Sequence, residues 1–266
     1  MRIATWNVNS IRSRLEHLQR WLTDQPVDVV CLQETKVVDE QFPLVPLQDL
    51  GYHCVISGQK SYNGVSILSR QPLEDVQIGF GAVLAAETVG DLDDQKRVIS
   101  GRIGSLRIIN LYVPNGSEIG SEKYEYKLRW LDCLQRYLMA LGDRESQIHI
   151  CGDFNIALED RDIYDPKGKE THIMSSPTER EALRQSVLSL GFVDAFRLFE
   201  DGADQFSWWD YRTGGFRRNR GWRIDHHYLS ESAKARAIAC YIDREPRGWE
   251  KPSDHTPVVL ELADES

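Results

Sequence analysis

Short apolar runs separated by polar, Gly-, Asn-, Asp- or Pro-containing turns recur along most of this 266-residue chain. Such runs, rich in Val, Ile and Leu, are typical of β-strands buried on one or both faces. The pattern predicts about eleven strands, at residues 3–8, 28–33, 53–57, 64–69, 98–103, 106–113, 147–151, 206–209, 223–229, 237–242 and 256–262.

Helical periodicity, with apolar residues three or four positions apart, marks the segments 15–22, 124–141 and 177–190. Ser176 precedes the third segment and Glu179 follows three residues later, which is a capping-box pattern. Three main helices are too few to link this many strands by helical crossovers. The order therefore predicts an α+β fold, with two packed and mostly antiparallel sheets and helices outside. No Gly-, Pro- or Ser-rich linker divides the chain, so we expect residues 1–266 to form a single domain.

Composition adds limits on the class of protein. Hydrophobic residues make up 41% of the chain, which is enough for a substantial core. No apolar run reaches the length of a membrane span or of a signal sequence, and we expect a cytoplasmic protein with no membrane partner. The five cysteines are widely spaced and form no CxxC pair, so we expect buried free thiols.

The charge is unevenly distributed. A net charge of -9 argues against coating nucleic acid by bulk electrostatics. Yet the segment RTGGFRRNRGWR, residues 212–223, carries five arginines and no acid, interleaved with Phe216 and Trp222. A solvated loop and a binding loop are about equally good interpretations of this segment.

Six predicted strands end on acids, amides or histidine. They end at Asn7 and Asn9, at Glu34, at Tyr112 and Asn115, at Asp153 and Asn155, at Asp225 with His226 or His227, and at Asp254 with His255. Strand ends of one compact sandwich can converge on one surface, where function concentrates. We therefore expect a single pocket rich in oxygen ligands.

The residue types suggest a phosphate ester as substrate. Glu34, Asp254 and Asn7 are hard oxygen donors suited to Mg²⁺ or Mn²⁺, which bind through a few carboxylates and substrate phosphate. Asp225 and His255 form an acid–imidazole pair, and Asp153 is a free acid–base group. Each signal alone is weak, because an Asp-His pair or a GDFN turn is often only structural. Their joint occurrence favours an active site.

The motifs together resemble those of exonuclease III and the abasic-site endonucleases, within the endonuclease/exonuclease/phosphatase superfamily. The match runs from end to end. It is carried, in order, by WNVNSIRSR, LQETK, GQKSYNGVSILSR, RVISGRI, INLYVPNG, KYEYKLRW, CGDFNIALEDRDIYDP, FSWWDYR, NRGWRIDH and PSDHTPV. The resemblance implies a four-layer αββα sandwich and a Mg²⁺-dependent repair nuclease, with Mn²⁺ as a substitute. The implied activities are incision 5′ to abasic sites in duplex DNA and 3′→5′ trimming.

The resemblance also implies roles for individual residues. Glu34 is the principal metal ligand, with Asn7 and Asp254 close to the metal or phosphate. At the scissile phosphate, Tyr112 makes contact, Asp153 acts in acid–base catalysis, Asn155 orients water or phosphate, and Asp225 holds His255. Some relatives carry Asp where this chain has Asn9, which puts a second metal in doubt.

Substrate specificity is implied for residues outside this set. Trp208, Trp222 and Ile224 match the lining of a pocket for a base-less sugar. Beside such a pocket, we expect Arg217, Arg218 and Arg220 to reach phosphates on either side of a kinked duplex. Asn115 and Arg212 join them as substrate-binding residues, while Trp209 is better interpreted as a core aromatic. We expect a monomer that binds duplex DNA with abasic sites or 3′ ends. The alternatives are a phosphatase or RNA nuclease of the same superfamily, and an inactive DNA-binding scaffold.

Overall fold

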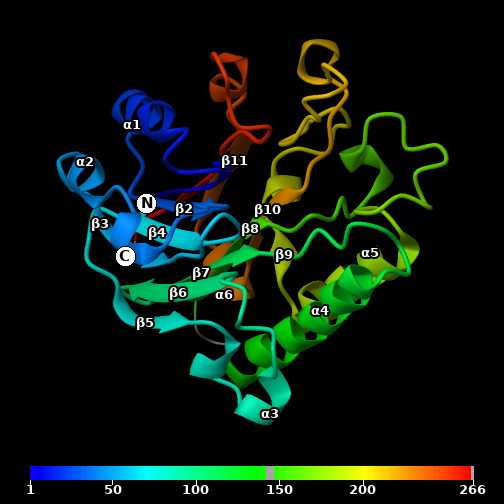
Figure 1. Ribbon diagram of the computed structural model, residues 1–266, viewed down its shortest axis with the longest axis horizontal. Helices are drawn as coiled ribbons and strands as arrows, with labels where there is room; N and C mark the ends of the chain where they lie inside the picture. The colour runs from blue at the N-terminus through cyan, green and yellow to red at the C-terminus, as the bar shows by residue number, and fades with distance from the viewer. Residues whose placement is uncertain (142–146, 265–266) are drawn as a thin grey trace.

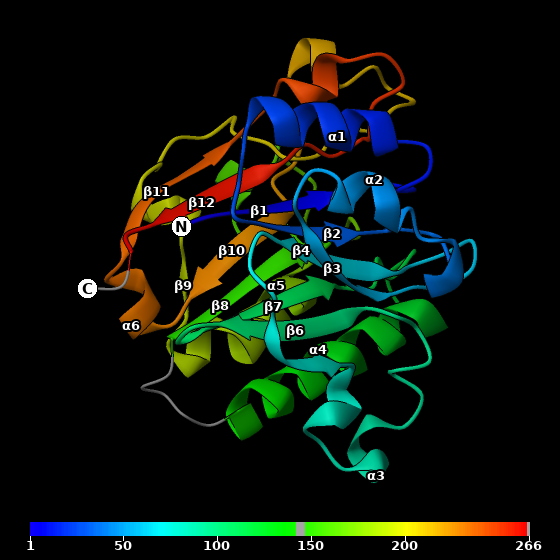
Figure 2. The ribbon, with the colours of Figure 1, turned by 90° about the vertical axis from the view of Figure 1, so that its left-hand side faces the viewer.

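The computed structural model describes residues 1–141 and 147–264 and places two six-stranded β-sheets face to face (Figures 1 and 2). The first sheet has the order β11-β12-β1-β2-β4-β3 and the second β5-β6-β7-β8-β10-β9. The strands are β1 (Arg2–Asn7), β2 (Val29–Gln33), β3 (His53–Ser57), β4 (Val65–Ser69), β5 (Glu74–Ile78), β6 (Val98–Ile103), β7 (Leu106–Tyr112), β8 (Gln147–Asp153), β9 (Val193–Asp194), β10 (Asp225–Leu229), β11 (Ala237–Ile242) and β12 (Val258–Leu262).

Helices cover the outer faces and complete the predicted four layers. They are α1 (Leu15–Asp24), α2 (Leu44–Gln48), α3 (Ala86–Val89), α4 (Glu122–Leu141), α5 (Pro177–Ser186) and α6 (Glu231–Lys234). Helix α1 buries Leu18, Trp21 and Leu22 against the first sheet, and α4 and α5 lie against the second (Figure 1). The predicted capping box at Ser176 and Glu179 is confirmed at the start of α5.

The core between the sheets explains why the strands read as continuous apolar runs. Side chains such as Val29 and Ile67 of the first sheet meet Ile99 and Ile108 of the second in one cluster. Because both faces of each sheet are covered, strands such as β2 and β4 are buried at every residue. The predicted α+β sandwich is confirmed.

The direction of the strands decides where the polar strand ends meet. Most neighbouring strands are antiparallel, as predicted, but β1 and β2 are parallel in the first sheet, and β7 and β8 are parallel in the second. Parallel neighbours end at the same edge of a sheet. Asn7 and Gln33 are therefore paired at the end of β1 and β2 in the first sheet, and Tyr112 and Asp153 at the end of β7 and β8 in the second.

Several predicted elements need correction. The predicted strand at 206–209 is wrong, because only isolated bridges join Trp208 to Trp222 and His255. Strand β5 escaped prediction because its sequence, EDVQI, is mostly exposed and polar. The predicted helix at 177–190 ends as an α-helix at Ser186 and continues as a 3₁₀ turn at Leu188–Leu190.

Other details of the chain agree with the sequence. His226 and His227 are buried strand residues of β10, and Trp209 is fully buried. The five cysteines are free, although Cys54 is only partly buried. Within the described ranges, none of the helices combines the length and apolarity needed to cross a bilayer.

Candidate active site

The polar ends of the two parallel strand pairs face each other across the sandwich. From the first sheet, Asn7 donates its amide to Glu34 Oε1 at 2.8 Å and to Asp153 Oδ2, across the sandwich, at 2.9 Å. Glu34 follows β2 in a left-handed conformation, with φ of 52°, which turns the chain directly after the strand. One buried amide thus holds together carboxylates from two sheets.

A glycine directly precedes Asp153 in β8, where the backbone leaves no room for a side chain. Gly152 has φ of 145°, and a Cβ there would lie 1.9 Å from the carbonyl oxygen of Leu111. A side chain at position 152 is therefore excluded. The backbone N–H of Asn155 donates to Asp153 Oδ1 at 2.9 Å and fixes the turn that follows.

A buried acid–imidazole pair lies beside Asp153. His255 donates from Nδ1 to Asp225 Oδ2 at 2.9 Å, and its Nε2 lies 3.7 Å from Asp153 Oδ2. Ser207 donates its hydroxyl to Asp225 at 2.6 Å and fixes that carboxylate. We call Glu34, Asp153, Asp225 and His255 the strand-end cluster.

The protonation of this cluster follows from burial and charge. Burial raises the pKa of Asp153 to about 7, partly offset by His255 and reinforced by Asp225. Burial alone would lower the pKa of His255, but the carboxylates of Asp225 and Asp153 outweigh it and raise that pKa to about 10. The imidazole is therefore a cation at neutral pH, next to an acid able to exchange a proton.

Glu34 differs from Asp153 in having a cationic partner. Burial opposes its charged form, but the Lys36 ammonium at 2.7 Å and the Asn7 amide lower its pKa. Tyr112 is buried nearby, and burial together with the Glu34 charge raises its pKa well above the usual value. Its hydroxyl is therefore a neutral hydrogen-bond donor at neutral pH.

Asp254 lies to one side of the strand-end cluster. Its carboxylate accepts hydrogen bonds from the Asn9 amide at 2.9 Å and from the Trp208 indole at 3.0 Å. Asn9 in turn accepts a bond from Lys36. An Asp at position 9 would place its carboxylate against that of Asp254. The amide of Asn9 avoids this repulsion and donates a hydrogen bond instead.

Two asparagines extend the site on the side of the second sheet. Asn115 donates its amide to Asn155 Oδ1 at 2.9 Å, and Asn155 donates to the carbonyl of Val113 at 3.0 Å. Asn155 has a left-handed backbone, with φ of 49°, which directs it out of β8. Asn115 is exposed, so its remaining polar capacity faces solvent or substrate.

Comparison with known proteins connects this geometry to a family. Residues 4–255 match the model of the Endonuclease/Exonuclease/phosphatase family. Exodeoxyribonuclease III of Haemophilus influenzae is 36% identical, with 98% of this chain and 100% of the relative covered. The chain belongs to the exonuclease III / AP endonuclease family of DNA repair nucleases.

Two solved structures of this family have the same fold. An AP endonuclease from Archaeoglobus fulgidus superposes with a TM-score of 0.92, at 40% identity, covering 98% of this chain and 99% of the other. The 3′ phosphatase NExo from Neisseria, bound to a product DNA hairpin, has a TM-score of 0.93 at 40% identity. That comparison covers 99% of this chain and 100% of the other.

A divalent metal ion is the cofactor of the exonuclease III / AP endonuclease family, and the donor set here fits a hard cation. Ligand atoms of Glu34, Asp153 and His255 all lie within 4.8 Å of one another. Carboxylate oxygens are the donors that such ions prefer. The predicted ligands Asn7 and Asp254 are less directly placed, since Asn7 turns its amide nitrogen toward the carboxylates and Asp254 bonds Asn9 and Trp208.

An apolar wall lies next to the strand-end cluster. Ile224 is buried with Ile163 and Met174, and Trp208 and Trp222 pack against them while remaining partly exposed. The two indole-bearing residues exchange backbone hydrogen bonds at 2.9 Å, which fixes them as a pair. Sequence reasoning missed Ile163 and Met174, because an isolated apolar residue in a loop carries no periodic signal.

The predicted arginine loop, residues 212–223, belongs to the gold segment that projects at the top of Figure 1. Four of its arginines are exposed and, among the described residues, none of the four forms an ion pair: Arg212, Arg217, Arg218 and Arg220. The fifth arginine of the segment, Arg223, is buried and bonded to Asp162 and Asp194. The loop therefore offers unneutralised positive charge beside the apolar wall.

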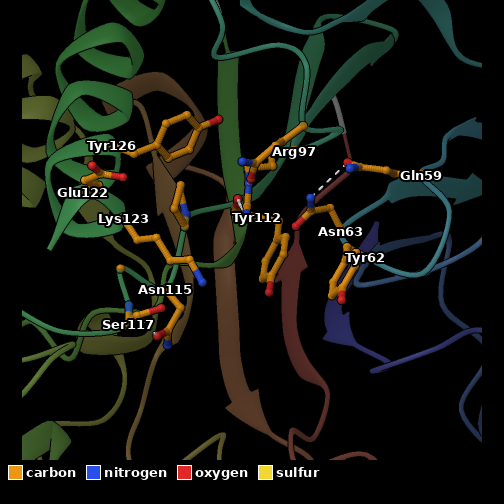
Figure 3. A pocket seen from close by; sticks show the side chains of 13 residues that line it. Gln59, Tyr62, Asn63, Arg97, Tyr112, Asn115, Ser117, Glu122, Lys123 and Tyr126 are labelled. Carbon is orange, nitrogen blue, oxygen red and sulfur yellow. Dashed lines mark hydrogen bonds between the residues drawn. The ribbon is translucent and has the colours of Figure 1, made fainter.

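A cleft of about 520 Å³ is lined by Tyr112 and Asn115, together with residues from two other segments (Figure 3). Gln59, Tyr62 and Asn63 from the β3–β4 loop form one side, and Lys123 and Tyr126 of α4 form the opposite one. The buried guanidinium of Arg97 stacks over Tyr112, 4.5 Å from the ring centre, and donates to its carbonyl oxygen. Sequence analysis did not select Arg97, although RVISGRI was among the matching motifs.

Proposed function

We propose that this protein hydrolyses the phosphodiester 5′ to abasic sites in duplex DNA, with 3′→5′ exonuclease and 3′-end trimming activity. Mg²⁺ is the proposed cofactor and Mn²⁺ a substitute. The observation that carries the proposal is the contact of a buried carboxylate, Asp153, with the His255–Asp225 pair, next to the apolar wall.

Hydrolysis proceeds by in-line attack of water on phosphorus, with cleavage of the bond to the 3′ oxygen. The products are a 3′ hydroxyl and a 5′ phosphate. Asp153 exchanges the proton at one of the two oxygens, either the attacking water or the departing 3′ oxygen. The imidazolium of His255 and the neutral donors Tyr112, Asn115 and Asn155 stabilise charge on the non-bridging oxygens. Glu34 would hold the Mg²⁺, with Asn7 and Asp254 close to the metal or phosphate, and the ion would supply further charge stabilisation there.

The apolar wall supports a preference for base-less nucleotides. A sugar without its base is small enough to lie against the partly exposed indoles of Trp208 and Trp222, which cover the buried Ile224. This apolar surface would exclude the base of a normal nucleotide, because it offers the polar groups of that base no partner. Arg212, Arg217, Arg218 and Arg220 would bind flanking phosphates, with affinity that falls as salt rises.

The similar structures leave a second candidate activity in view. A 3′ phosphatase and an AP endonuclease resemble this chain equally well, at 40% identity each. Removal of a 3′ phosphate needs the same acid–base and phosphate groups but not the apolar wall.

We also propose that residues 1–266 act as one catalytic domain, as a cytoplasmic monomer.

The test is Mg²⁺-dependent cleavage of a labelled duplex with one internal abasic site, beside duplexes with an undamaged sequence and with a 3′ phosphate. We expect a nick 5′ to the lesion that EDTA abolishes. Trp222→Ala should reduce abasic incision by about tenfold and 3′-phosphate removal much less, because the base-less sugar loses an apolar contact of its pocket wall. Trp249→Ala, which removes an indole that packs against Arg20 of α1, is the control and should change neither. Removal of the 3′ phosphate without any nick would favour the phosphatase.

A further inference from the structure

A lysine lies fully buried between the two active-site loops and α5. Lys127, in the second turn of α4, has no exposed surface. Its ammonium donates to the carbonyl oxygens of Asn115 at 3.1 Å and Asn155 at 2.9 Å, and to Glu179 Oε1 at 2.5 Å. The three donors of the ammonium are thus used on three separate segments of the chain.

Both carboxylate oxygens of Glu179 accept hydrogen bonds as well. Its Oε1 also accepts the backbone N–H of Met174 at 3.0 Å, and its Oε2 accepts from the backbone N–H and hydroxyl of Ser176. Met174 has a left-handed backbone, with φ of 71°, which is unusual for a residue with a side chain. Met174 belongs to the apolar wall, so Glu179 holds a strained residue of that wall in place.

Stability alone is a weak reason for such a pair. Taking both charges out of water is costly, and apolar residues of similar volume often stabilise a fold as well or better. A methionine side chain at position 127 would fill the same space. What only the ammonium and carboxylate provide here is a rigid polar link from the two asparagine carbonyls to the backbone of Met174.

We propose that Lys127 and Glu179 are positioning residues, which set the spacing between Asn115 and Asn155 on one side and the apolar wall on the other. The pair thereby controls both the rate of hydrolysis and the preference for a base-less nucleotide. This inference rests on the proposed function, because the preference concerns the substrate proposed above. Neither residue touches the reacting atoms.

The main variant is K127M/E179Q. It removes both charges, so that no buried charge is left unpaired, and the introduced glutamine side chain keeps an oxygen for the Met174 N–H. We expect kcat for abasic incision to fall at least about tenfold with little change in KM, because small misplacement of substrate-facing groups is costly. We also expect the ratio of abasic incision to 3′-end trimming to fall several-fold.

The matched control is Leu134→Ala on the same helix. Leu134 is fully buried in the hydrophobic core, and its side chain has no polar group to link the two loops. The substitution should lower the melting temperature while the ratio of the two activities stays as in wild type, at a temperature where all proteins are folded. Equal losses of rate and preference in both variants would overturn the proposal and reduce the pair to a structural role. So would wild-type rate and preference in K127M/E179Q.

A second variant and a readout other than activity separate this inference from the proposed function. E179Q alone leaves both carbonyl contacts of Lys127 and should lower the preference more than the rate. The side-chain amide NMR signals of Asn115 and Asn155, assigned through substitution by Ser, should shift in K127M/E179Q but not in Leu134→Ala. If wild type nicks no abasic site, the proposed function fails. In that case the amide signals and the rate at 3′ ends still test whether Lys127 and Glu179 position the two asparagines. Unchanged amide signals would refute that role.

Discussion

Two clusters of buried charge in this protein are built in opposite ways. In the first, which we call the arginine cluster, Arg223 bonds Asp162 and Asp194 at 2.7 Å each, and Arg197 also bonds Asp162. In the strand-end cluster, three carboxylates share one imidazolium and the ammonium of Lys36. The first is balanced in charge, whereas the second carries an excess of acid.

The pKa values express the same contrast. Burial raises the pKa of both Asp153 and Asp162, but only Asp162 has a guanidinium that outweighs burial and lowers its pKa to about 2. Asp153, with a pKa raised to about 7, is available for proton exchange or for a cation. A buried acid with a guanidinium partner thus supports the fold, and one without it indicates function.

The sharpest test of the contrast is Asp153→Asn. We expect turnover to fall by about 10²- to 10⁴-fold, because the acid–base group is lost. DNA binding and the free energy of unfolding should be retained, since no buried guanidinium loses its partner. Single-turnover cleavage, binding and denaturant unfolding measure the three quantities. Turnover close to wild type would remove Asp153 from the acid–base role.

Asp162→Asn should act in the opposite way. It leaves Arg223 and Arg197 short of a buried partner, and we expect a loss of about 3–5 kcal/mol in the free energy of unfolding. Activity per folded molecule should remain near wild type at a temperature where the variant is folded. The control, Asp160→Asn, removes an exposed carboxylate that pairs with Arg180 and should cost less than about 1 kcal/mol.

The difference in unfolding free energy between wild type and Asp162→Asn should depend on pH, because the pKa of Asp162 is lowered. A folded-state pKa of about 2, below the ordinary value of 3.8, means that the charged carboxylate stabilises the fold fully above pH 3.8. That contribution is lost as pH falls toward 2. The gap in unfolding free energy between wild type and Asp162→Asn should therefore narrow between about pH 4 and pH 2, as urea unfolding at several pH values would show. A constant gap would refute the ionic account.

Glu34→Ala tests the carboxylate of the strand-end cluster that is partly exposed. We expect the Mg²⁺ concentration for half-maximal cleavage to rise by about tenfold or more, since one of few carboxylate ligands is lost. A titration of Mg²⁺ at fixed DNA measures the shift. Asp39→Ala, an acid in the loop after β2 that bonds the backbone of Gly58, is the control. An unchanged midpoint in Glu34→Ala would contradict metal ligation.

The smallest expected effect concerns the arginine loop. Arg217→Ala/Arg218→Ala removes two exposed cations that, within the described chain, form no ion pair. The slope of log affinity against log salt should decrease by about 2, with cleavage of bound DNA unchanged. Arg102→Ala, on β6, should leave the slope as in wild type. A double variant with the wild-type slope would identify the loop as merely solvated.

Apolar strands were the most predictable part of the fold. Ten of the eleven predicted strands are present, because strands such as β2 and β4 are buried on both faces and read as unbroken apolar runs. Strand β5 is exposed and polar, and β9 has two residues, so neither has a pattern to detect. The run at 206–209 is apolar because Phe206 and Trp209 are buried, yet its backbone bonds a loop instead of a sheet.

For the candidate site, the residue types could be predicted but not their partners. The polar strand ends do converge, because parallel pairing of β1 with β2 and of β7 with β8 brings them to one edge. The roles of Ser207 and Lys127 depend on hydrogen bonds to residues 12 to 52 positions away, which no local pattern encodes. The charge pattern located the arginines, but only the structure separates the buried Arg223 from the exposed four.

The course of β1 has a practical consequence. This strand starts at Arg2, beside the carbonyl of Leu262 that accepts the amino terminus, and ends at Asn7 in the site. Six extended residues span about 20 Å, so Met1 lies a full strand length from the strand-end cluster. A tether attached there would anchor single molecules to a surface with the strand-end cluster still facing long DNA in solution.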